Sequence, residues 1–360
     1  MAELLHNYQR GIGAWMDLFD HGLNYQREVV RRAYSSQLIM QALCALSSKQ
    51  LSMVTPGEVW HAAAGRYYGE SLRLLISALV DATSSQQDAL LATILLSSYE
   101  LLASPGLDHR RHVLGAVTLI KKHDFTARSK SLERASFWVY ARLDIALALI
   151  NECPTMLGPE EWNVSWAEQE MEEDGLANQM LWILAKVIAF TFREGQVLPE
   201  ADLSFRSELL VEMNTWFEAL PPSVKGVSYG PPSRDGFVKH WFAVPVSAAA
   251  MFTYHLANLL LLGEGVNCSI QKDDHSQAAI QYHAHYIGDI CQSDIADAAL
   301  VQGVQPLYYG EFSHVSTAAK HIDGLARKAK LWAILEDIEA RLGFHTSSRV
   351  VKLQELADVR

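Results

Sequence analysis

Cysteine is scarce in this chain of 360 residues, which contains only Cys44, Cys153, Cys268 and Cys291. No two of them are close enough in sequence to form a Cys-x-x-Cys pair, the spacing that closely paired zinc ligands have. We therefore expect no metal site. Scattered cysteines, and the lack of a basic and apolar leader segment, are typical of a protein in a reducing compartment inside the cell.

Recognised catalytic motifs are also missing. The sequence has no Gly-x-Ser-x-Gly elbow, no His-Glu-x-x-His pair, no phosphate-binding Gly-x-x-x-x-Gly-Lys loop and no deaminase zinc motif. Gly11 and Gly13 resemble the start of a dinucleotide-binding loop, but no strand precedes them and Met16 occupies the third glycine position. These absences exclude the common motif-bearing enzymes and leave others untouched, and we expect no cofactor.

Positive charge is in deficit, since 30 Lys and Arg residues face 41 Asp and Glu residues, for a formal net charge of -11. Affinity for nucleic acid phosphates comes mainly from Lys and Arg that displace counterions, so we expect this chain by itself not to bind nucleic acid. An acidic run from Glu168 to Asp174 lacks the ordered spacing of a calcium loop, which favours a solvated acidic face over a metal site.

Alternation of polar and apolar residues, the pattern of a half-buried β-strand, is almost absent. Apolar residues instead recur at helical spacing, hydrophobic residues make up 49% of the chain, and no Gly/Ser linker divides it. The sequence therefore predicts an all-α protein, a multi-helix array of antiparallel helical pairs around a central buried helix. We expect residues 1–360 to form a single domain.

The central buried helix is predicted over residues 91–102, where Leu91 and Leu95 share one face and Leu96 makes the other side apolar too. Ser85 and Asp88 provide a capping-box start. A helix is also predicted from about Gln26 to Gln50. It should pair with its neighbours through short joints.

Residues 241–262 contain no Asp, Glu, Lys or Arg, a run long enough to span a bilayer by length alone. His255 and Asn258 lie within it, and such polar groups find partners inside a protein but not in lipid. The sequence favours a buried core helix, and we expect no membrane partner. The preceding segment, 221–236, has four prolines and three glycines and is the best candidate for a mobile loop or lid.

A series of sequence runs carries a resemblance to a known family. In chain order they are GAWMDLFD, SSQLIMQALCALSSKQL, RYYGESLRLLISAL, YELL, HRRHVLGAVTLI, ASFWVYARLDIALALI, NQMLWILAKVIAF, TYHLANLLLL and LARKAKLWAILEDIEARLGF. Together they resemble the regulatory domain of fungal binuclear-zinc-cluster transcription factors, the second of the two common fungal-specific types, over nearly the whole chain. The resemblance implies an all-helical nuclear module that responds to a ligand or controls activation, often for a metabolic gene cluster.

The DNA-binding part of that family, a cluster of six cysteines around two zinc ions, has no counterpart in this sequence. Two interpretations follow. In the first, the chain is a nuclear regulatory module without its own DNA-binding cluster, tied to secondary metabolism. It senses a small hydrophobic metabolite or binds a partner regulator, and a homodimer is one expected assembly. In the second, it is a cytoplasmic enzyme that cyclises or isomerises a hydrophobic metabolite in a helical cavity.

The catalytic candidates under the enzyme alternative are His112, Tyr140 and Asp144. Tyr140 and Asp144 are four residues apart and share a helix face. If His112 or Arg111 of the preceding helix reached Asp144, a buried acid–base pair would result that could hold a polar ligand group or move a proton. A purely structural salt link is the competing interpretation.

The ligand-binding candidates are aromatic, histidine and arginine side chains from two regions of the chain. They are Tyr99, Arg111, His240, Trp241, Tyr308 and His314. The competing interpretation is that aromatic rows at helical spacing are core residues. His283 and His285, two apart on a helix, point to different sides and make a poor metal pair.

Overall fold

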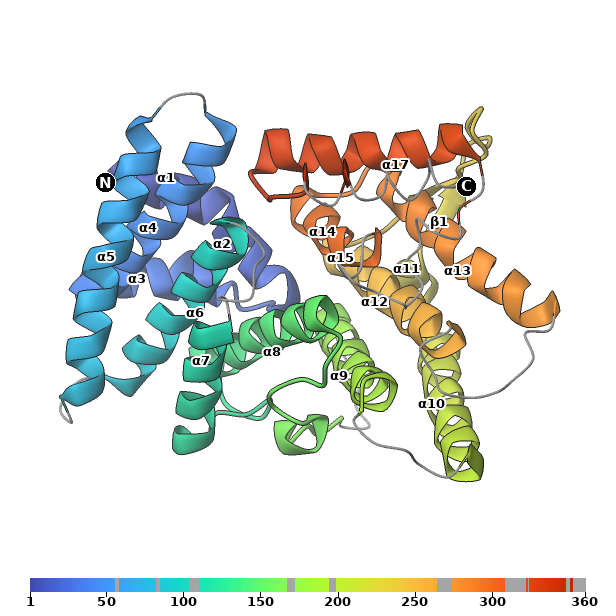
Figure 1. The fold of residues 1–360 in the computed structure, drawn as a ribbon, viewed down its shortest axis with the longest axis horizontal. Helices are drawn as coiled ribbons and strands as arrows, with labels where there is room; N and C mark the ends of the chain where they lie inside the picture. Colours follow the sequence, from blue (N-terminus) through green and yellow to red (C-terminus); the bar gives the residue numbers. More distant parts are fainter. Residues whose placement is uncertain are drawn as a thin grey trace. The chain divides into compact units, whose positions relative to one another are not determined.

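The structure, a computed structural model, describes residues 1–55, 58–81, 85–103, 110–166, 172–193, 199–263, 274–307, 322, 324–347 and 350–351. Contacts divide the chain into two compact units. Unit 1 comprises Met1–Asp144, Glu160–Ser165 and Asp337–His345, and unit 2 comprises Ile145–Pro159, Trp166–Glu336 and Thr346–Arg360. Within these ranges the regular structure is helical except for one short hairpin, which confirms the all-α prediction (Figure 1). The single-domain organisation stays a prediction.

Unit 1 is built from short helices at the N-terminus followed by longer ones. They are α1 (Ala2–Arg10), α2 (Ile12–Met16), η1 (Asp17–Phe19), η2 (Tyr25–Val29), α3 (Val30–Ala33), α4 (Gln37–Val54), α5 (Val59–Val80), α6 (Gln86–Ala103), α7 (Arg110–His123), the first part of α8 (Ser131–Asn151), most of η4 (Pro159–Trp162) and η5 (Ile338–Leu342). The helix α4 packs against α1, α3, α5, α6 and η5, so it forms the middle of this unit.

Polar groups on α4 are satisfied within the core that encloses them. The helix is buried from Ala42 to Gln50. Ser47 donates a hydrogen bond to the carbonyl of Leu4 at 2.8 Å, and the Gln50 amide donates to the carbonyl of Leu342 at 3.0 Å. These bonds join the N-terminal helix and η5 to α4. They also satisfy polar groups that would cost stability if they were buried without a partner.

The helix that the sequence predicts over 91–102 is α6. It begins as predicted, since the backbone N–H of Asp88 donates to Ser85 Oγ at 3.2 Å. Residues 89–97 of this helix are buried, and it packs against α4, α5 and α7. The helix α6 is therefore a core helix of unit 1, but α4 packs against more elements of the unit than α6 does.

The predicted continuous helix from Gln26 to Gln50 is wrong, because the chain breaks at residues 34–36. Ser36 has an extended backbone, with φ -123° and ψ 108°, and α4 starts after it. Ser35 Oγ donates to the carbonyl of Arg32 at 3.1 Å. Such local side-chain bonds compete with the helical backbone pattern, which explains why two adjacent serines end one helix and precede the next.

Unit 2 is organised around α12 (Pro245–Leu262). The other elements are α9 (Glu173–Thr191), α10 (Pro199–Ala219), α11 (Pro222–Lys225), β1 (Val227–Tyr229), β2 (Lys239–Trp241), α13 (Asp274–Cys291), α14 (Asp297–Gln302), α15 (Val304–Leu307) and α17 (Leu325–Asp337), whose last residue belongs to unit 1. The helix α12 packs against α9, α10, α11, α13, α14 and α15.

By length and composition α12 is the one described helix that could cross a membrane, with a mean hydropathy of 1.3, and 89% of it is buried. Its polar side chains bond to its own backbone, Thr253 to the carbonyl of Ala249 and Asn258 to that of Tyr254, each at 2.9 Å. The helix is buried against six other elements of the unit, as predicted for a core helix.

The segment 221–236, predicted as a loop or lid, holds α11 and the first strand of a hairpin. The strands β1 and β2 are antiparallel, with Ser228 opposite His240 in the register. Each strand has three residues, too few for the two-residue alternation that identifies strands in a sequence. The hairpin positions His240 beside α13, as described next, while mobility of this segment stays a prediction.

Candidate functional site

A histidine cluster lies where α12, α13 and β2 meet in unit 2. We use this name for His240, His255, His283 and Tyr286. The rings of His255 and Tyr286 stack with centroids 4.2 Å apart and planes at 20°, and His240 lies 4.5 Å from the same tyrosine ring. His255 comes from α12, His283 and Tyr286 from α13, and His240 from β2.

Local structure explains how these residues converge. Because α12 is buried on all sides, His255 is carried into the core of the unit. His283 and Tyr286 are three residues apart on α13 and therefore share a face. His240 is the middle residue of β2, where exposure alternates along the strand, so His240 is buried and Trp241 is 58% exposed.

Hydrogen bonds fix the position of His240 against α13. The backbone N–H of His240 donates to Ser293 Oγ at 2.8 Å, and that of Val238 donates to Asp289 Oδ1 at 2.9 Å. The second oxygen of Asp289 lies 3.9 Å from His240 Nε2. Asp289 therefore holds the strand by its backbone and places a carboxylate beside the imidazole.

The two histidines at the centre of the cluster are neutral. Their Nδ1 atoms lie 2.8 Å apart, so one nitrogen donates and the other accepts, and the two rings hold different tautomers. Burial lowers the pKa of His255 well below its ordinary value, and His283 and His240 lower it further. Burial lowers the pKa of His283 to about 4. His255 and His283 are therefore both uncharged at neutral pH.

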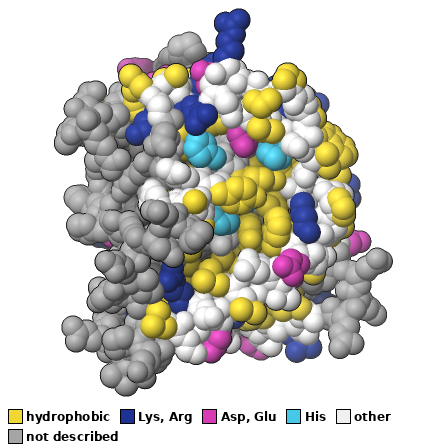
Figure 2. Space-filling model, turned by 90° about the vertical axis from the view of Figure 1, so that its right-hand side faces the viewer, with side chains coloured by type: hydrophobic (Ala, Val, Ile, Leu, Met, Phe, Trp, Pro, Cys, Tyr) yellow, Lys and Arg dark blue, Asp and Glu magenta, His cyan; other side chains and the backbone are white. Residues whose placement is uncertain are grey.

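Two buried ring nitrogens of the cluster have no hydrogen-bond partner within the described part of the chain. They are His255 Nε2 and His240 Nδ1. A buried polar atom left unpaired costs about 1–3 kcal/mol, so both atoms favour a bound polar group, whether water or a ligand. Two exposed aromatic side chains lie on the same elements, Tyr282 on α13 and Trp241 on β2. Figure 2 shows histidines among hydrophobic side chains on one face of the molecule.

Of the residues predicted as a central catalytic set, His112 has its contacts on α5 and α6. His112 Nε2 lies 3.1 Å from Glu100 Oε1 and 3.3 Å from the hydroxyl of Tyr68, which donates to the same glutamate oxygen at 2.6 Å. The Tyr68 ring also stacks on Tyr99 with centroids 4.5 Å apart. His112 therefore binds partners on α5 and α6.

Tyr140 and Asp144 do meet, as their spacing on α8 predicts. The hydroxyl of Tyr140 donates to Asp144 Oδ2 at 2.9 Å, and both side chains are buried. Burial, and then the charge of Asp144, raises the pKa of Tyr140, which keeps the phenol protonated as a donor. This geometry is that of a structural hydrogen bond, and no observation on these residues favours the enzyme alternative.

The remaining predicted site residues are Tyr99, Arg111, Tyr308 and His314. Arg111 is exposed near the start of α7, and Tyr99 is half-buried on α6. Tyr308 and His314 lie outside the described residues. Sequence analysis missed Glu100, whose signal is a carboxylate among apolar residues near the end of α6. It treated His283 only as half of a poor metal pair with His285.

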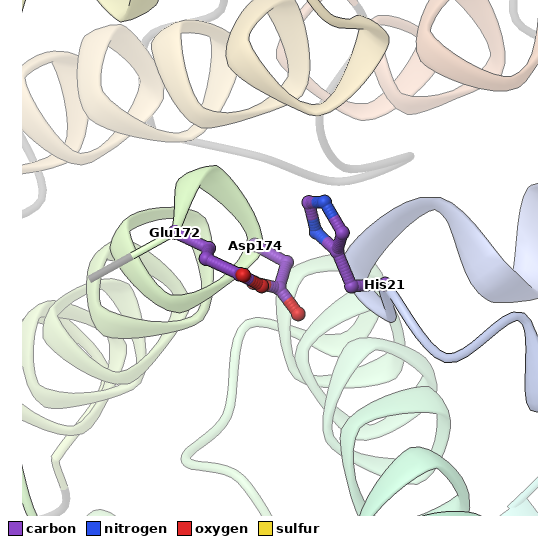
Figure 3. Close-up of side chains that lie close together, drawn as sticks. All are labelled: His21, Glu172 and Asp174. Atoms are coloured by element: carbon purple, nitrogen blue, oxygen red, sulfur yellow. The ribbon is translucent and has the colours of Figure 1, made fainter.

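The acidic run before α9 was predicted to be a solvated face. Its described carboxylates are Glu172, which is exposed, Glu173, which is half-buried, and Asp174, which is buried. Asp174 accepts a hydrogen bond from the N–H of Gly175 at 2.8 Å, and Figure 3 shows it with Glu172. His21, labelled in the same view, belongs to unit 1. Neither unit by itself brings three metal-ligating groups together among its described residues.

Comparison with known proteins supports the resemblance drawn from the sequence. Residues 3–175 match the family described as "Fungal specific transcription factor domain", which supports the resemblance for that part of the chain. The chain is also similar to "Transcription activator AMTR1" from Alternaria alternata, at 21% identity over 99% of this chain. The chain spans 63% of the length of that relative. No solved structure matches the chain.

Proposed function

We propose, from the match of residues 3–175 to the fungal specific transcription factor domain, that this chain is a transcription-regulatory module that acts through protein contacts in the nucleus. The similarity to a protein named as a transcription activator supports this proposal. Direct DNA binding is not part of it, because the chain has four cysteines, too few for a six-cysteine zinc cluster, and a net charge of -11.

The experiment is a tethering assay. The chain is fused to the DNA-binding domain of an unrelated regulator, and a reporter gene carries the binding site of that domain. We expect the fusion to change reporter output relative to the DNA-binding domain alone, and the purified chain to leave a DNA probe unshifted. A folded, expressed fusion that leaves the reporter unchanged would contradict the regulatory role.

Small-molecule sensing is the finer part of the proposal, and we assign it to the histidine cluster. A planar metabolite with apolar surface and hydrogen-bonding groups would satisfy His255 Nε2 and His240 Nδ1 and stack among the neighbouring rings. This retains His240 as a ligand-binding candidate and adds His255, which the sequence analysis did not single out. A metabolite of secondary metabolism, as the family resemblance implies, would fit this description.

The sensing proposal is tested by thermal-shift screening of fungal metabolite fractions against the purified chain. Fractions that raise the melting temperature of the wild type are then applied to His255→Phe, which keeps a ring and removes the nitrogens. We expect the shift to disappear in this variant and to persist in His6→Asn, which changes an exposed histidine of α1. Equal shifts in wild type and His255→Phe would remove the cluster from the sensing role.

A further inference from the structure

One side of α5 carries an apolar stripe that is exposed along most of its length, with Leu72 half-buried. Its members follow one another at alternating intervals of three and four residues, the spacing of the a and d positions of a coiled coil. They are Ala62, Gly65, Gly69, Leu72, Ile76 and Leu79, which we call the α5 stripe. Ile76 is 64% exposed and Leu79 is 51% exposed.

The opposite side of α5 faces the unit. Ala64, Ser71 and Leu75 are buried there, and the helix packs against α4 and α6. A Cβ atom placed on Gly65 or Gly69 would meet nothing within 4 Å, so the stripe borders open space at both glycines. A helix that is already packed on its inner side therefore has a second apolar seam, which a soluble protein exposes mainly at interaction sites.

The α5 stripe is complementary to itself when read in the opposite direction. Its first half is small, with alanine and two glycines, and its second half is large, with two leucines and one isoleucine. Antiparallel coiled-coil packing brings a positions opposite d positions. Two copies would then form the layers Ala62–Leu79, Gly65–Ile76 and Gly69–Leu72, each occurring twice by symmetry.

Every one of these layers sets a bulky side chain against a small one. The helices can approach closely, because glycine and alanine leave room for the leucine or isoleucine of the other copy. A parallel pair would instead place glycine opposite glycine and isoleucine opposite isoleucine, with gaps at one end and crowding at the other. We propose that the α5 stripe is an antiparallel homodimer interface, occupied by the same stripe of a second copy of this chain.

Two arginines, Arg66 and Arg73, flank the stripe on one side, and the antiparallel pair would bring Arg66 of one copy beside Arg73 of the other. Arg73 forms a salt bridge with Glu70 on the same helix, at 2.6 Å, so the pair carries no net charge toward a second copy. Val59 and Val80, at the two ends of the helix, are 77% and 84% exposed and extend the apolar surface along its length. The 22 residues of α5 give a seam of about 33 Å.

The strength of the dimer follows from the size of this seam. A typical stable interface buries about 800 Å² on each partner, and one helix pair supplies less than that. We therefore expect a weak dimer whose population rises with protein concentration. Sedimentation velocity across a concentration series measures it, and a chain that stays monomeric throughout the series overturns the proposal.

Two substitutions separate loss of the interface from loss of the fold. Ile76→Lys places a charge in the seam, and we expect its dimerisation Kd to rise at least about tenfold, which corresponds to about 1.4 kcal/mol. The matched control is Val211→Lys, at an exposed position of α10, which should dimerise as the wild type does. Equal Kd values for Ile76→Lys and wild type overturn the proposal.

Gly65→Leu is the sharper variant, because it should affect dimer and monomer in opposite directions. The added side chain meets no atom of its own unit and replaces glycine within a helix, so the melting temperature of the monomer should not fall. The same side chain fills the space that Ile76 of the second copy occupies, so dimerisation should be lost. A Gly65→Leu protein that dimerises like the wild type overturns the antiparallel packing.

Disulfide trapping tests the direction of the helices. Gly65→Cys and Ile76→Cys are prepared as separate proteins, oxidised alone and as a mixture, and compared with the wild-type chain on non-reducing gels. The proposed layers put position 65 opposite position 76, so a cross-linked dimer should form in the mixture above the level of either protein alone. Cross-linking of each protein with itself alone, or no cross-linking at all, overturns the proposed arrangement.

Discussion

Acidification should destabilise unit 2 through the histidine cluster. Burial lowers the pKa of His283 to about 4, from an ordinary value of 6.5. Because the folded-state pKa is below the unfolded one, the unfolded chain takes up the proton first as the pH falls. The stability that the neutral histidine provides is complete above pH 6.5 and is lost between about pH 6.5 and pH 4.

The magnitude follows from the pKa difference. Between pH 7 and pH 5, His283 stays neutral in the folded protein and becomes protonated in the unfolded chain. This loss amounts to about 2 kcal/mol of unfolding free energy, at 1.36 kcal/mol per pKa unit. His255, whose pKa is lowered further by burial and by both neighbouring histidines, adds to the loss in the same direction.

The assay is urea unfolding followed by circular dichroism at pH 7 and pH 5, for wild type, His283→Asn and His6→Asn. Asparagine at position 283 can keep a hydrogen bond to His255 Nδ1 but has no proton to bind in this range. We expect its unfolding free energy to fall by about 2 kcal/mol less than that of the wild type, and His6→Asn, at an exposed position, to behave as the wild type. Identical pH dependence in wild type and His283→Asn would refute the reasoning.

Three further outcomes follow from unit 1. Burial raises the pKa of Asp17 from 3.8 to about 6, so its contribution has the opposite sign and is lost as the pH rises through 6. Asp17→Asn should remove about 2 kcal/mol of pH dependence from urea unfolding between pH 4 and pH 7. Gly65→Ala and Gly69→Ala should each stabilise α5 by about 1 kcal/mol in thermal melts, measured in the Ile76→Lys background to exclude effects on the dimer. Arg142→Met should cost about 3 kcal/mol in urea unfolding, because the guanidinium donates to the carbonyls of Trp15 and Met16. Arg142→Lys, which keeps a charge, should recover part of this loss.

Local features of the sequence predicted the structure well. The Ser85 cap, the burial of the uncharged run in α12 and the Tyr140–Asp144 bond each depend on residues within one helix. Helical periodicity determines which side chains share a face, and a cap needs only a few neighbouring residues. These predictions therefore required no knowledge of how one helix meets the next.

Contacts between helices were outside the reach of the same reasoning. Whether His112 or Arg111 reaches Asp144 could not be derived from the sequence, and the structure shows His112 bound to Glu100 and Tyr68. Which turn of a helix faces its neighbour depends on the crossing angle and on the side chains that interdigitate. The hairpin was missed for a different reason, since strands of three residues carry no detectable period. The burial of His240 and the exposure of Trp241 follow from the hairpin and were missed with it.

The α5 stripe and the histidine cluster lie in different units, so one assay can separate their roles. In the tethered reporter, a regulator that works as a dimer should lose output with Ile76→Lys and keep it with Val211→Lys. A regulator controlled by a metabolite should instead lose its response to that metabolite with His255→Phe, while its dimerisation is unchanged. If both variants act, the double variant decides between the two arrangements: additive losses indicate independent contributions, whereas a double variant no worse than either single variant indicates that ligand binding and pairing of α5 serve one common step.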